Sequence, residues 1–429
     1  MPDRDRPANR GPKQVQTNPA SDVAVVTPWY PTGQRPFRGA FVQAMVEATA
    51  PEYQQVTVYH TDEWGHRLPA ETTAAIDEAF RALLPQGVHR RPTVGGADLV
   101  HLPVVMPVTP DYATISRNHT EALRAALGNA PIDAPVVHAH VGLPGGWAAL
   151  QNARPDARVF VTEHATFLNL VLEQPEARAM YDDLLHRCAG FFAVGDAVRN
   201  PLVEAFPHHA DRIGFIPNPI SFDQPRATPV SALHRWLFVG GLLPRKGVSW
   251  LLEAFAKCRA EEPALTLTFV GEGQLRKDLT RRAGELGVAE AVTFAGAVAP
   301  DEALRMMREH DLLVHPSRFE TFGMTIVEAI AAGTPVLVTR CGGPEETLAG
   351  LEEAAGELIP VEENAESIVD GYRRLRDRFP HGLDLDRARR ELADRYSYPA
   401  VARSHREAWF GTPGPGMSTT TGWDARTDG

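Results

Sequence analysis

The sequence is poor in cysteine, and its few cysteines lie far apart. Cys188, Cys258 and Cys341 are at least 70 residues from one another. This spacing gives neither a disulfide framework nor a paired metal-ligand motif, so we expect reduced thiols. No stretch approaches the roughly 18 apolar residues of a membrane helix, and residues 1–21 carry charge and proline where a signal peptide needs an apolar run. The sequence predicts a cytoplasmic protein.

Positive charge is also scarce. The 43 Lys+Arg residues against 54 Asp+Glu residues leave a net charge of −11, which does not attract nucleic-acid phosphates or anionic lipid. Lys13 is the only lysine in the first 220 residues, and the amphipathic pattern at 71–84 is net acidic. Docking to a membrane through a basic helix is therefore disfavoured, and so is nucleic acid as a partner. Hydrophobic residues still make up 43% of the chain, which is enough for large cores.

Short β-branched apolar runs alternate with helical patterns in two consecutive series, over 22–220 and 225–396. Continuous apolar strands separated by helices are typical of parallel sheets covered on both faces. We therefore predict an α/β protein with two doubly wound domains. The last amphipathic pattern, 397–410, either completes the second domain or crosses back to the first. Residues 1–21 and 411–429 lack hydrophobic periodicity and are expected to be disordered.

Parallel sheets bind ligands at the carboxyl ends of their strands, so the loops after the apolar runs are candidate sites. The loop 239–247 joins paired glycines, including Gly241, to the adjacent cations Arg245 and Lys246. Two adjacent cations beside a glycine-rich turn suit a diphosphate. A solvated basic turn is the alternative.

A second loop, 319–328, places Glu320 before Gly323 and Glu328 on the helix that follows. A helix that begins at Gly323 exposes free amide groups, which attract anions. One carboxylate could bind a sugar hydroxyl and the other a ribose. Two glutamates with no ligand are the alternative.

Histidines follow two strands of the first series, as His138-Ala139-His140 and as Thr162-Glu163-His164. Alternation places His138 and His140 on one sheet face. No nearby carboxylate or cysteine completes a metal set, so we expect no metal there. Packed or surface histidines are the alternative.

Other motifs carry weaker signals. Gly271-Glu272-Gly273 lacks the third glycine of a dinucleotide fingerprint, and Asp384 and Asp386 precede a helix, where an aspartate is ordinarily a cap. The sequence contains neither a G-x-S-x-G nucleophile elbow nor a Walker loop.

Several segments in order resemble one enzyme family across nearly the whole body of the chain. They are WYPTGQRPFRGAFV, HAHVGLPGG, VTEHAT, AVGDAVRNPL, FIPNPISF, FVGGLLPRKGVSWLLEAF, FVGEGQL, VTFAGAV and HPSRFETFGMTIVEAIAAGTPVLVTRCGGPEE. Together they resemble glycosyltransferase family 4, the retaining GT-B enzymes that use nucleotide sugars. Glu320 and Glu328 form the E-x7-E arrangement of that family.

The resemblance implies two Rossmann-like domains that face a central cleft, the N-terminal one for the acceptor and the C-terminal one for the donor. It implies catalytic roles for His140, Glu320 and Lys246. The residues expected to bind the donor are Gly39, Gly241, Arg245, Lys246, Gly271, Val298, Glu320, Gly323, Met324, Thr325 and Glu328. Those expected near the acceptor are His138, His140, His164 and Thr166. Many members have arginine where this chain has Gly241, and Arg245 could supply that charge instead.

The resemblance further implies a hexosyltransferase that moves a sugar from a UDP- or GDP-linked donor. Fixed cations and helix amides can stabilise the departing diphosphate, so we expect neither a metal nor another cofactor. The acidic, lysine-poor first half favours a small soluble acceptor, such as a cyclitol, aminocyclitol, sugar or thiol-bearing metabolite of natural-product biosynthesis. The alternatives are a lipid- or polysaccharide-directed transferase, a nucleotide-sugar epimerase or hydrolase, an idle sugar-nucleotide-binding protein and an NAD-dependent oxidoreductase.

Overall fold

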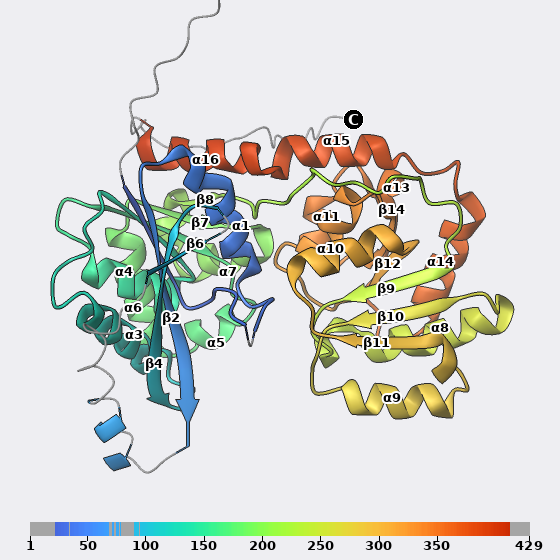
Figure 1. Cartoon of the computed structure of the whole chain (residues 1–429), viewed down its shortest axis with the longest axis horizontal. Helices are drawn as coiled ribbons and strands as arrows, with labels where there is room; N and C mark the ends of the chain where they lie inside the picture. Colours follow the sequence, from blue (N-terminus) through green and yellow to red (C-terminus); the bar gives the residue numbers. More distant parts are fainter. Residues whose placement is uncertain are drawn as a thin grey trace, which may run out of the picture.

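The computed structural model of the chain describes residues 22–411, apart from 34, 68–70, 73, 77, 79–89 and 94. The ends predicted to be disordered, 1–21 and 411–429, lie outside the described residues, apart from Gly411. Two α/β halves lie side by side, and two consecutive helices run along one side of both (Figure 1). Each half has its own parallel sheet, so the predicted α/β class with two parallel-sheet domains is confirmed.

The N-terminal half is built on a sheet with strand order β3-β4-β2-β1-β5-β6-β7-β8. Neighbouring strands are parallel, except that β3 runs antiparallel to β4. The strands are β1 Val23–Thr27, β2 Val56–His66, β3 Arg90–Pro92, β4 Asp98–Pro107, β5 Val136–His140, β6 Arg158–Glu163, β7 Gly190–Ala193 and β8 Ile213–Phe215. The helices are α1 Ala40–Thr49, α3 Tyr112–Ala126, α4 Trp147–Asn152, α5 Leu168–Leu172, α6 Pro175–Arg187 and α7 Asp196–Ala205.

The C-terminal half has an all-parallel sheet with order β11-β10-β9-β12-β13-β14. Its strands are β9 Arg235–Val239, β10 Thr266–Val270, β11 Val292–Gly296, β12 Leu312–His315, β13 Val336–Thr339 and β14 Gly356–Ile359. The helices of this part of the chain are α8 Val248–Glu261, α9 Arg276–Glu285, α10 Pro300–Glu309, α11 Met324–Ala331, α12 Gly343–Thr347, α13 Glu352–Ala355, α14 Glu366–Arg378, α15 Leu385–Tyr396 and α16 Tyr398–Phe410.

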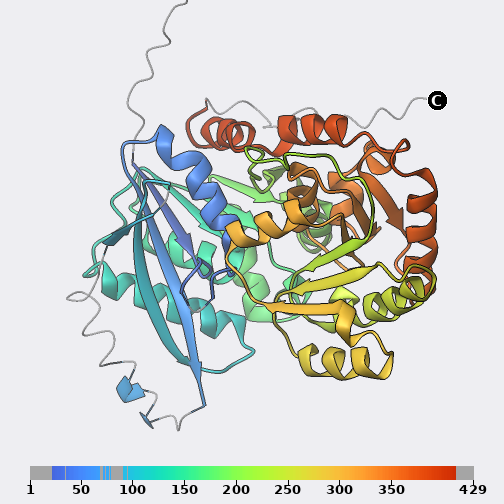
Figure 2. The same cartoon turned by 45° about the vertical axis from the view of Figure 1, so that its right-hand side comes forward.

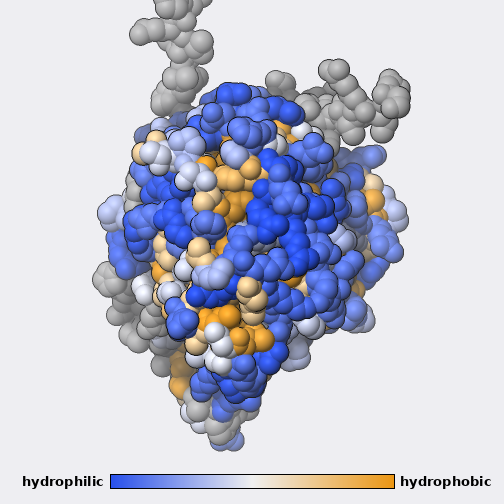
Figure 3. Space-filling model, turned by 90° about the vertical axis from the view of Figure 1, so that its right-hand side faces the viewer, coloured by the Kyte–Doolittle hydropathy of each residue, from blue (hydrophilic) through white to orange (hydrophobic). Residues whose placement is uncertain are grey.

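Helices cover both faces of each sheet, which explains why the central strands are apolar without alternation, whereas the edge strand β11 alternates between partly buried and exposed residues. In β1, Val23 and Val25 face α1 and α16, while Ala24 and Val26 face the core under α3 and α4. Residues 216–234 form the linker between β8 and β9. The outer surface of the C-terminal half is largely hydrophilic (Figure 3).

Helix α16 crosses back to the N-terminal half. It packs along α1, and Trp409 near its end is fully buried in the core that contains β1. Arg158 of β6 donates a hydrogen bond of 2.7 Å to the Trp409 carbonyl oxygen. No helix in the described ranges has the length and apolar character needed to cross a bilayer.

Candidate active site

Lys246, Glu320 and His315 meet at the carboxyl ends of β9 and β12. The Lys246 ammonium donates a hydrogen bond to Glu320 Oε1, and His315 Nε2 lies 2.9 Å from the same oxygen. All three side chains are largely buried, and the His315 ring stacks on Phe238 with centroids 5.2 Å apart. The structure therefore unites the two predicted catalytic residues of this half.

Electrostatics keep the Glu320 carboxylate charged. Burial alone would raise its pKa, but the hydrogen bond from His315 and the Lys246 ammonium outweigh that effect and hold the pKa well below its ordinary value. Burial lowers the pKa of His315, although Glu320 opposes that shift. The result is a fixed negative charge at the carboxyl ends of β9 and β12, where it can accept hydrogen bonds from a ligand.

The loop that carries Lys246 is pressed against the loop after β12. Gly247 has a φ of 67°, and a Cβ there would lie 2.0 Å from the Pro316 carbonyl oxygen. Only glycine permits both this left-handed backbone and this close approach. The amide of Arg318 donates a hydrogen bond of 2.7 Å to the Arg245 carbonyl oxygen. These contacts fix Arg245 and Lys246 at the carboxyl edge.

Helix α11 begins directly after the Glu320 loop, with Gly323 as its N-cap residue. Met324 and Thr325 are half-buried at its first turn, where backbone amides have no acceptor within the helix. These amides and the positive end of the helix dipole favour an anion. The predicted set Gly323, Met324 and Thr325 therefore lies beside Glu320 in an arrangement able to receive a phosphate or a sugar hydroxyl.

Glu328, one turn further along α11, has a different environment from Glu320. It is half-buried, and none of the described residues supplies a hydrogen bond or an ion pair to its carboxylate. Burial raises its pKa to about 7. A carboxylate left without donors suits a ligand that brings hydroxyl groups.

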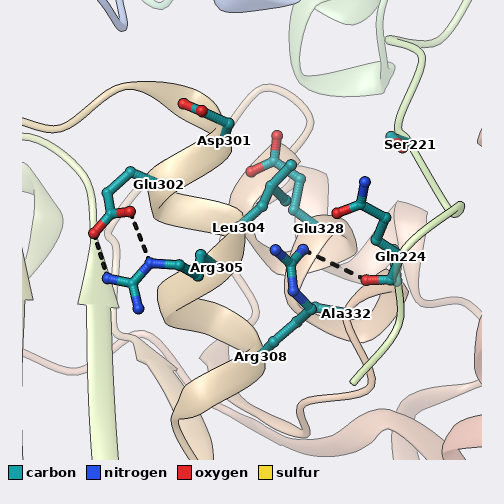
Figure 4. A pocket seen from close by; sticks show the side chains of 10 residues that line it. Ser221, Gln224, Asp301, Glu302, Leu304, Arg305, Arg308, Glu328 and Ala332 are labelled. Carbon is teal, nitrogen blue, oxygen red and sulfur yellow. Dashed lines mark hydrogen bonds and ion pairs between the residues drawn. The ribbon is translucent and has the colours of Figure 1, made fainter. Parts of the chain in front are cut away.

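Glu328 also lines a pocket of about 420 Å³ between α10, α11 and the linker. Figure 4 shows the α10 side chains on one side, Ser221 and Gln224 of the linker on the other, and Glu328 between them. The sequence did not single out these α10 and linker residues, because they come from outside the strand-end loops. The lining is formed by Ser221, Gln224, Asp301, Glu302, Leu304, Arg305, Arg308, Glu328, Ala331 and Ala332.

The other residues predicted to bind the sugar donor lie in the loops that follow β9, β10 and β11. Gly271 follows β10, and its amide donates to the Gly296 carbonyl oxygen at 2.7 Å. Arg245 Nη1 lies 3.5 Å from the Phe319 carbonyl oxygen. A Cβ at Gly241 would lie 3.3 Å from Leu243 Cδ1, so a side chain there needs only a small shift of Leu243. Val298, after β11, is half-buried against the core.

In the N-terminal half, His140 is the last residue of β5 and His164 directly follows β6. His140 Nδ1 lies 2.9 Å from His164 Nε2, and the Phe41 ring covers both histidines. His140 Nε2 is buried without a hydrogen-bond partner among the described residues. Burial lowers the pKa of both rings, so the pair is neutral near pH 7. Val141, the next residue, is held at a φ of 67°, a strained conformation for a β-branched residue.

Glu163 was not assigned a role from the sequence, yet it organises this edge. Its carboxylate accepts amide hydrogen bonds of 2.8 Å from Gly142, His164 and Ala165, and another from the Tyr181 hydroxyl. Burial raises its pKa, and these hydrogen bonds oppose the rise. The T-E-H motif placed Glu163 at a strand end, but nothing in the sequence showed that its donors would come from the β5 loop and α6.

His138 does not belong to an acceptor site. It is 0% exposed, with Nε2 lying 2.8 Å from Thr162 Oγ1 and Nδ1 accepting a 2.8 Å hydrogen bond from the Trp409 indole. Both ring nitrogens are thus occupied by the protein, and the prediction that His138 contacts the acceptor is wrong. Thr166, in contrast, is exposed beyond β6.

Gly39 shapes the loop after β1. It has a φ of 75° as the N-cap of α1, and a Cβ there would lie 2.3 Å from the Trp29 carbonyl oxygen. The described residues of this loop, 28–33 and 35–39, therefore lie close to the start of α1, on the side of the N-terminal half that faces the C-terminal half (Figures 1 and 2). The role of Gly39 beside the donor phosphates stays a prediction.

In the part of the chain that the structure describes, one side-chain group has metal-binding geometry: Asp182, His208 and His209. His208 Nε2 and His209 Nε2 lie 2.7 and 3.3 Å from Asp182 Oδ1. These residues come from the last turns of α6 and the turn before β8, at the amino ends of the strands. The group therefore lies on the opposite edge of the sheet from His140 and His164.

The two halves meet directly at α7. Glu346 of α12 accepts a hydrogen bond of 2.7 Å from the Asp196 amide, at the N-terminus of α7. Gly195 lies against Thr321 and Glu346, since a Cβ there would be 2.7 Å from an oxygen of each. Tyr398 donates a hydrogen bond of 3.3 Å to Glu47 of α1. These contacts bring the carboxyl edges of the two sheets into one region.

Comparison with known proteins identifies each half separately. Residues 39–224 match the model described as Glycosyltransferase Family 4, and residues 232–384 match the model described as Glycosyl transferases group 1. A D-inositol 3-phosphate glycosyltransferase of Nocardia farcinica is 28% identical over 271 residues, which cover 57% of this chain and 60% of that protein. The matched stretches span between 26% and 60% of the length of the curated relatives.

Solved structures share the whole architecture. Sucrose-phosphate synthase from Thermosynechococcus elongatus superposes with a TM-score of 0.67 at 18% identity, covering 90% of this chain and 97% of that one. Anabaena HepE, solved in complex with UDP and glucose, gives a TM-score of 0.61 at 18% identity over 90% of this chain and 98% of that one. At these identities the likeness establishes the fold, which is the GT-B fold.

Proposed function

Because the chain belongs to the glycosyltransferases through the family 4 and group 1 domains of its two halves, we propose that it transfers a sugar from a nucleoside-diphosphate sugar to a small polyol acceptor. The donor is UDP- or GDP-linked, and the anomeric configuration is retained. The observation that carries the proposal is the buried Lys246–Glu320–His315 cluster beside the free amides of α11.

The donor binds across the carboxyl edge of the C-terminal sheet in this proposal. Arg245 and Lys246 contact the diphosphate, the α11 amides contact phosphate and sugar oxygens, and Glu320 accepts hydrogen bonds from sugar hydroxyls. Glu328 accepts the ribose hydroxyls, which supply the donors that its carboxylate lacks in the free protein. Lys246 and the amides are fixed before the reaction, so they stabilise the leaving group without reorganisation.

In the chemical step, the acceptor hydroxyl oxygen forms a bond to the anomeric carbon on the face from which the diphosphate departs. The bond between the anomeric carbon and the β-phosphate oxygen breaks, and its electron pair stays on the diphosphate. The hydroxyl proton passes to that phosphate oxygen, so the products are a glycoside and a nucleoside diphosphate. His140 Nε2 is buried and has no hydrogen-bond partner among the described residues. It lies at the carboxyl end of β5, in the N-terminal half, and in this proposal a sugar hydroxyl donates to it or accepts from it.

The cations and amides of this edge supply the charge stabilisation that a metal would otherwise provide, so the proposed reaction needs no metal.

The acceptor class is supported by the relatives, whose printed names include D-inositol 3-phosphate glycosyltransferase and sucrose-phosphate synthase. Cys188, Cys258 and Cys341 are buried and free, which supports a reducing, cytoplasmic location.

A nucleotide panel tests the donor half of the proposal. UDP, GDP, ADP and dTDP, and then their sugars, are added in thermal-shift experiments. A ligand that binds the folded state alone raises the melting temperature, so we expect one base to raise it by several degrees. Product analysis by NMR with a polyol panel then separates transfer from hydrolysis or epimerisation. No shift with any nucleotide contradicts the proposal.

A further inference from the structure

A second cluster of charged and polar side chains lies in the N-terminal half, outside the residues assigned so far. It is centred on Asp62 of β2, and we refer to it as the Asp62 cluster. Its members come from the loop after β1, from β2 and from the neighbouring strand β4, and they are Arg35, Arg38, His60, Asp62, Trp64 and His101.

The two oxygens of Asp62 have different surroundings. Oδ2 accepts a hydrogen bond of 3.1 Å from the Trp64 indole and lies 3.3 Å from His101 Nε2. Oδ1 faces Arg35 Nη1 at 3.6 Å and Arg38 Nη1 at 3.9 Å. Both contacts are ion pairs that are too long for a direct hydrogen bond, so the N–H groups of the two guanidiniums remain able to donate to a ligand oxygen.

Neither guanidinium makes a hydrogen bond within the described part of the chain, although each carries five donors. Arg35 keeps 46% of its side chain exposed and Arg38 keeps 26%. Glu63 offsets part of their charge from the next position of β2, where it also lies 3.5 Å from His119. Converging arginine forks of this kind match the oxygens of a phosphate or carboxylate.

The remaining members have the character of a sugar-binding surface. Trp64 is 47% exposed, and its indole N–H donates to Asp62, which holds the aromatic side chain beside the carboxylate. His60 is buried, and neither of its ring nitrogens has a hydrogen-bond partner among the described residues. Burial lowers its pKa to about 3, so it is a neutral donor or acceptor and not a further cation.

The cluster is adjacent to the proposed reaction centre. Arg35 and Arg38 lie on the loop 28–39, which faces the C-terminal half (Figures 1 and 2). The same loop packs near the β5 end, because Pro28 Cδ lies 3.2 Å from the Cβ position of Gly145. Strand β1 lies between β2 and β5, with Thr27 opposite His60 and Val26 opposite Ala139, so Asp62 and His140 both lie just beyond the carboxyl end of β1. A ligand held between Arg35 and Asp62 therefore lies at the same edge of the sheet as His140.

We propose that the Asp62 cluster binds an acceptor that is a polyol with an anionic group, a phosphorylated cyclitol or sugar. Arg35 and Arg38 hold the anionic group, while Asp62 and His101 hold neighbouring hydroxyls against the Trp64 ring. The proposal rests on the proposed function and adds the charge of the acceptor and the residues that select it.

The experiment is a calorimetric titration of the full chain saturated with the nucleoside diphosphate that the nucleotide panel identifies. The probes are myo-inositol and inositol 1-phosphate, glucose and glucose 6-phosphate, and inorganic phosphate. Wild type is compared with the double variant Arg35→Ala/Arg38→Ala, with Arg35→Lys/Arg38→Lys, and with Asp62→Asn. Arg90→Ala is the matched control, because Arg90 also faces an aspartate at 3.9 Å, on β3 of the same half.

We expect each phosphorylated probe to bind at least about 10-fold more tightly than its neutral parent, as befits charged hydrogen bonds. The double alanine variant removes this preference, the lysine variant keeps part of it, and Asp62→Asn weakens the neutral and phosphorylated probes alike. Arg90→Ala changes nothing, and the nucleotide Kd is unchanged in every variant, which also shows that each is folded.

The inference is overturned if phosphorylated and neutral probes bind equally, if no phosphorylated probe binds, or if the preference survives in the double alanine variant. Tight binding of inorganic phosphate alone, with no gain from the polyol, contradicts the hydroxyl-binding role of Asp62. Failure of the proposed function has a different signature, since wild type then binds no nucleotide before any acceptor probe is added.

Discussion

Glu320 and Glu328 belong to one motif but differ in charge state because their neighbours differ. Glu320 has His315 and Lys246 as partners, and its pKa lies well below the ordinary value despite burial. The Glu328 carboxylate has no hydrogen-bond or ion-pair partner among the described residues, and burial raises its pKa to about 7. The first carboxylate is charged before the donor arrives, whereas the second becomes fully charged only when a ligand supplies hydrogen-bond donors.

The raised pKa of Glu328 predicts a pH dependence of donor binding. In the proposed donor complex, ribose hydroxyls donate to the charged form of Glu328, so affinity should rise as pH passes through about 7, by up to about 10-fold between pH 6 and pH 8. The Kd of the nucleotide sugar, whose diphosphate does not titrate in this range, measures the effect. Glu328→Gln removes the pH dependence, and an unchanged slope in that variant contradicts the assignment.

Stability carries the opposite sign at the same residue. The pKa of Glu328 is higher in the folded protein than in the unfolded chain. The free energy of unfolding therefore falls as pH rises from about 4.5 to about 7, because the folded protein must then either keep the proton or bury a charge. Glu328→Gln should therefore raise the melting temperature more at pH 8 than at pH 5. Equal changes in melting temperature at both pH values would show that the charge of Glu328 does not destabilise the folded protein.

Sequence reasoning found the residues of this site that stand in loops after apolar runs. Arg245, Lys246 and Glu320 were visible because adjacent cations and strand-end carboxylates are unusual there. Glu163 was not assigned, since its role depends on Tyr181, 18 residues away. His315 was not assigned because it ends an apolar strand, and only the fold of the following loop brings Glu320 back to it. Local pattern predicts which residues are available, whereas the fold decides which of them meet.

At the scale of elements, α16 shows the same difference between what the local sequence pattern predicts and what the fold decides. Its amphipathic pattern was clear in the sequence, but the pattern left open which half it would cover. The structure places it against α1, where the Trp409 indole donates to His138 Nδ1. His138 thereby becomes an anchor for a helix more than 250 residues later. A histidine at a strand end looked like a ligand residue because its partner was remote in sequence.

Truncation of Trp409 tests the importance of this crossing. Trp409→Ala should destabilise the protein by about 3–5 kcal/mol, since it empties a buried site and removes the donor to His138. Phe410→Ala is the matched control, because its ring is 38% exposed, and should cost about 1 kcal/mol or less. Urea unfolding followed by circular dichroism measures both. Equal losses would mean that α16 is not anchored through Trp409.

At the scale of the whole molecule, the proposed reaction site takes residues from both halves and therefore depends on how they dock. Glu346 of the C-terminal half accepts from the first amide of α7 in the N-terminal half, so a carboxylate of one half caps a helix of the other. The alternation of strands and helices predicted two domains. It contained no information on this contact, because a single hydrogen bond between surfaces leaves no periodic signal.

Glu346→Ala should loosen the docking. Burial raises the pKa of Glu346 to about 7, so at pH 8 the lost hydrogen bond is one to a charged group and is worth about 1.5–3 kcal/mol. At that pH, small-angle scattering should show a larger radius of gyration than in wild type. Nucleotide affinity should change little, while transfer slows, because the donor site belongs to one half and the acceptor comes from the other. Glu353→Ala, on the exposed surface of the same half, should leave the radius unchanged. An unchanged radius in Glu346→Ala would contradict the role of this contact.

The central claim is that Lys246, paired with Glu320 at the carboxyl edge of the C-terminal sheet, stabilises the departing diphosphate. The direct measurement is the transfer rate of Lys246→Ala against that of Lys257→Ala, which removes an exposed lysine paired with Glu366 on the same half. We predict at least a 100-fold lower kcat for Lys246→Ala, of the order expected for one electrostatic contact to the transition state, and a near-normal rate for Lys257→Ala. Equal rates in the two variants would contradict the account.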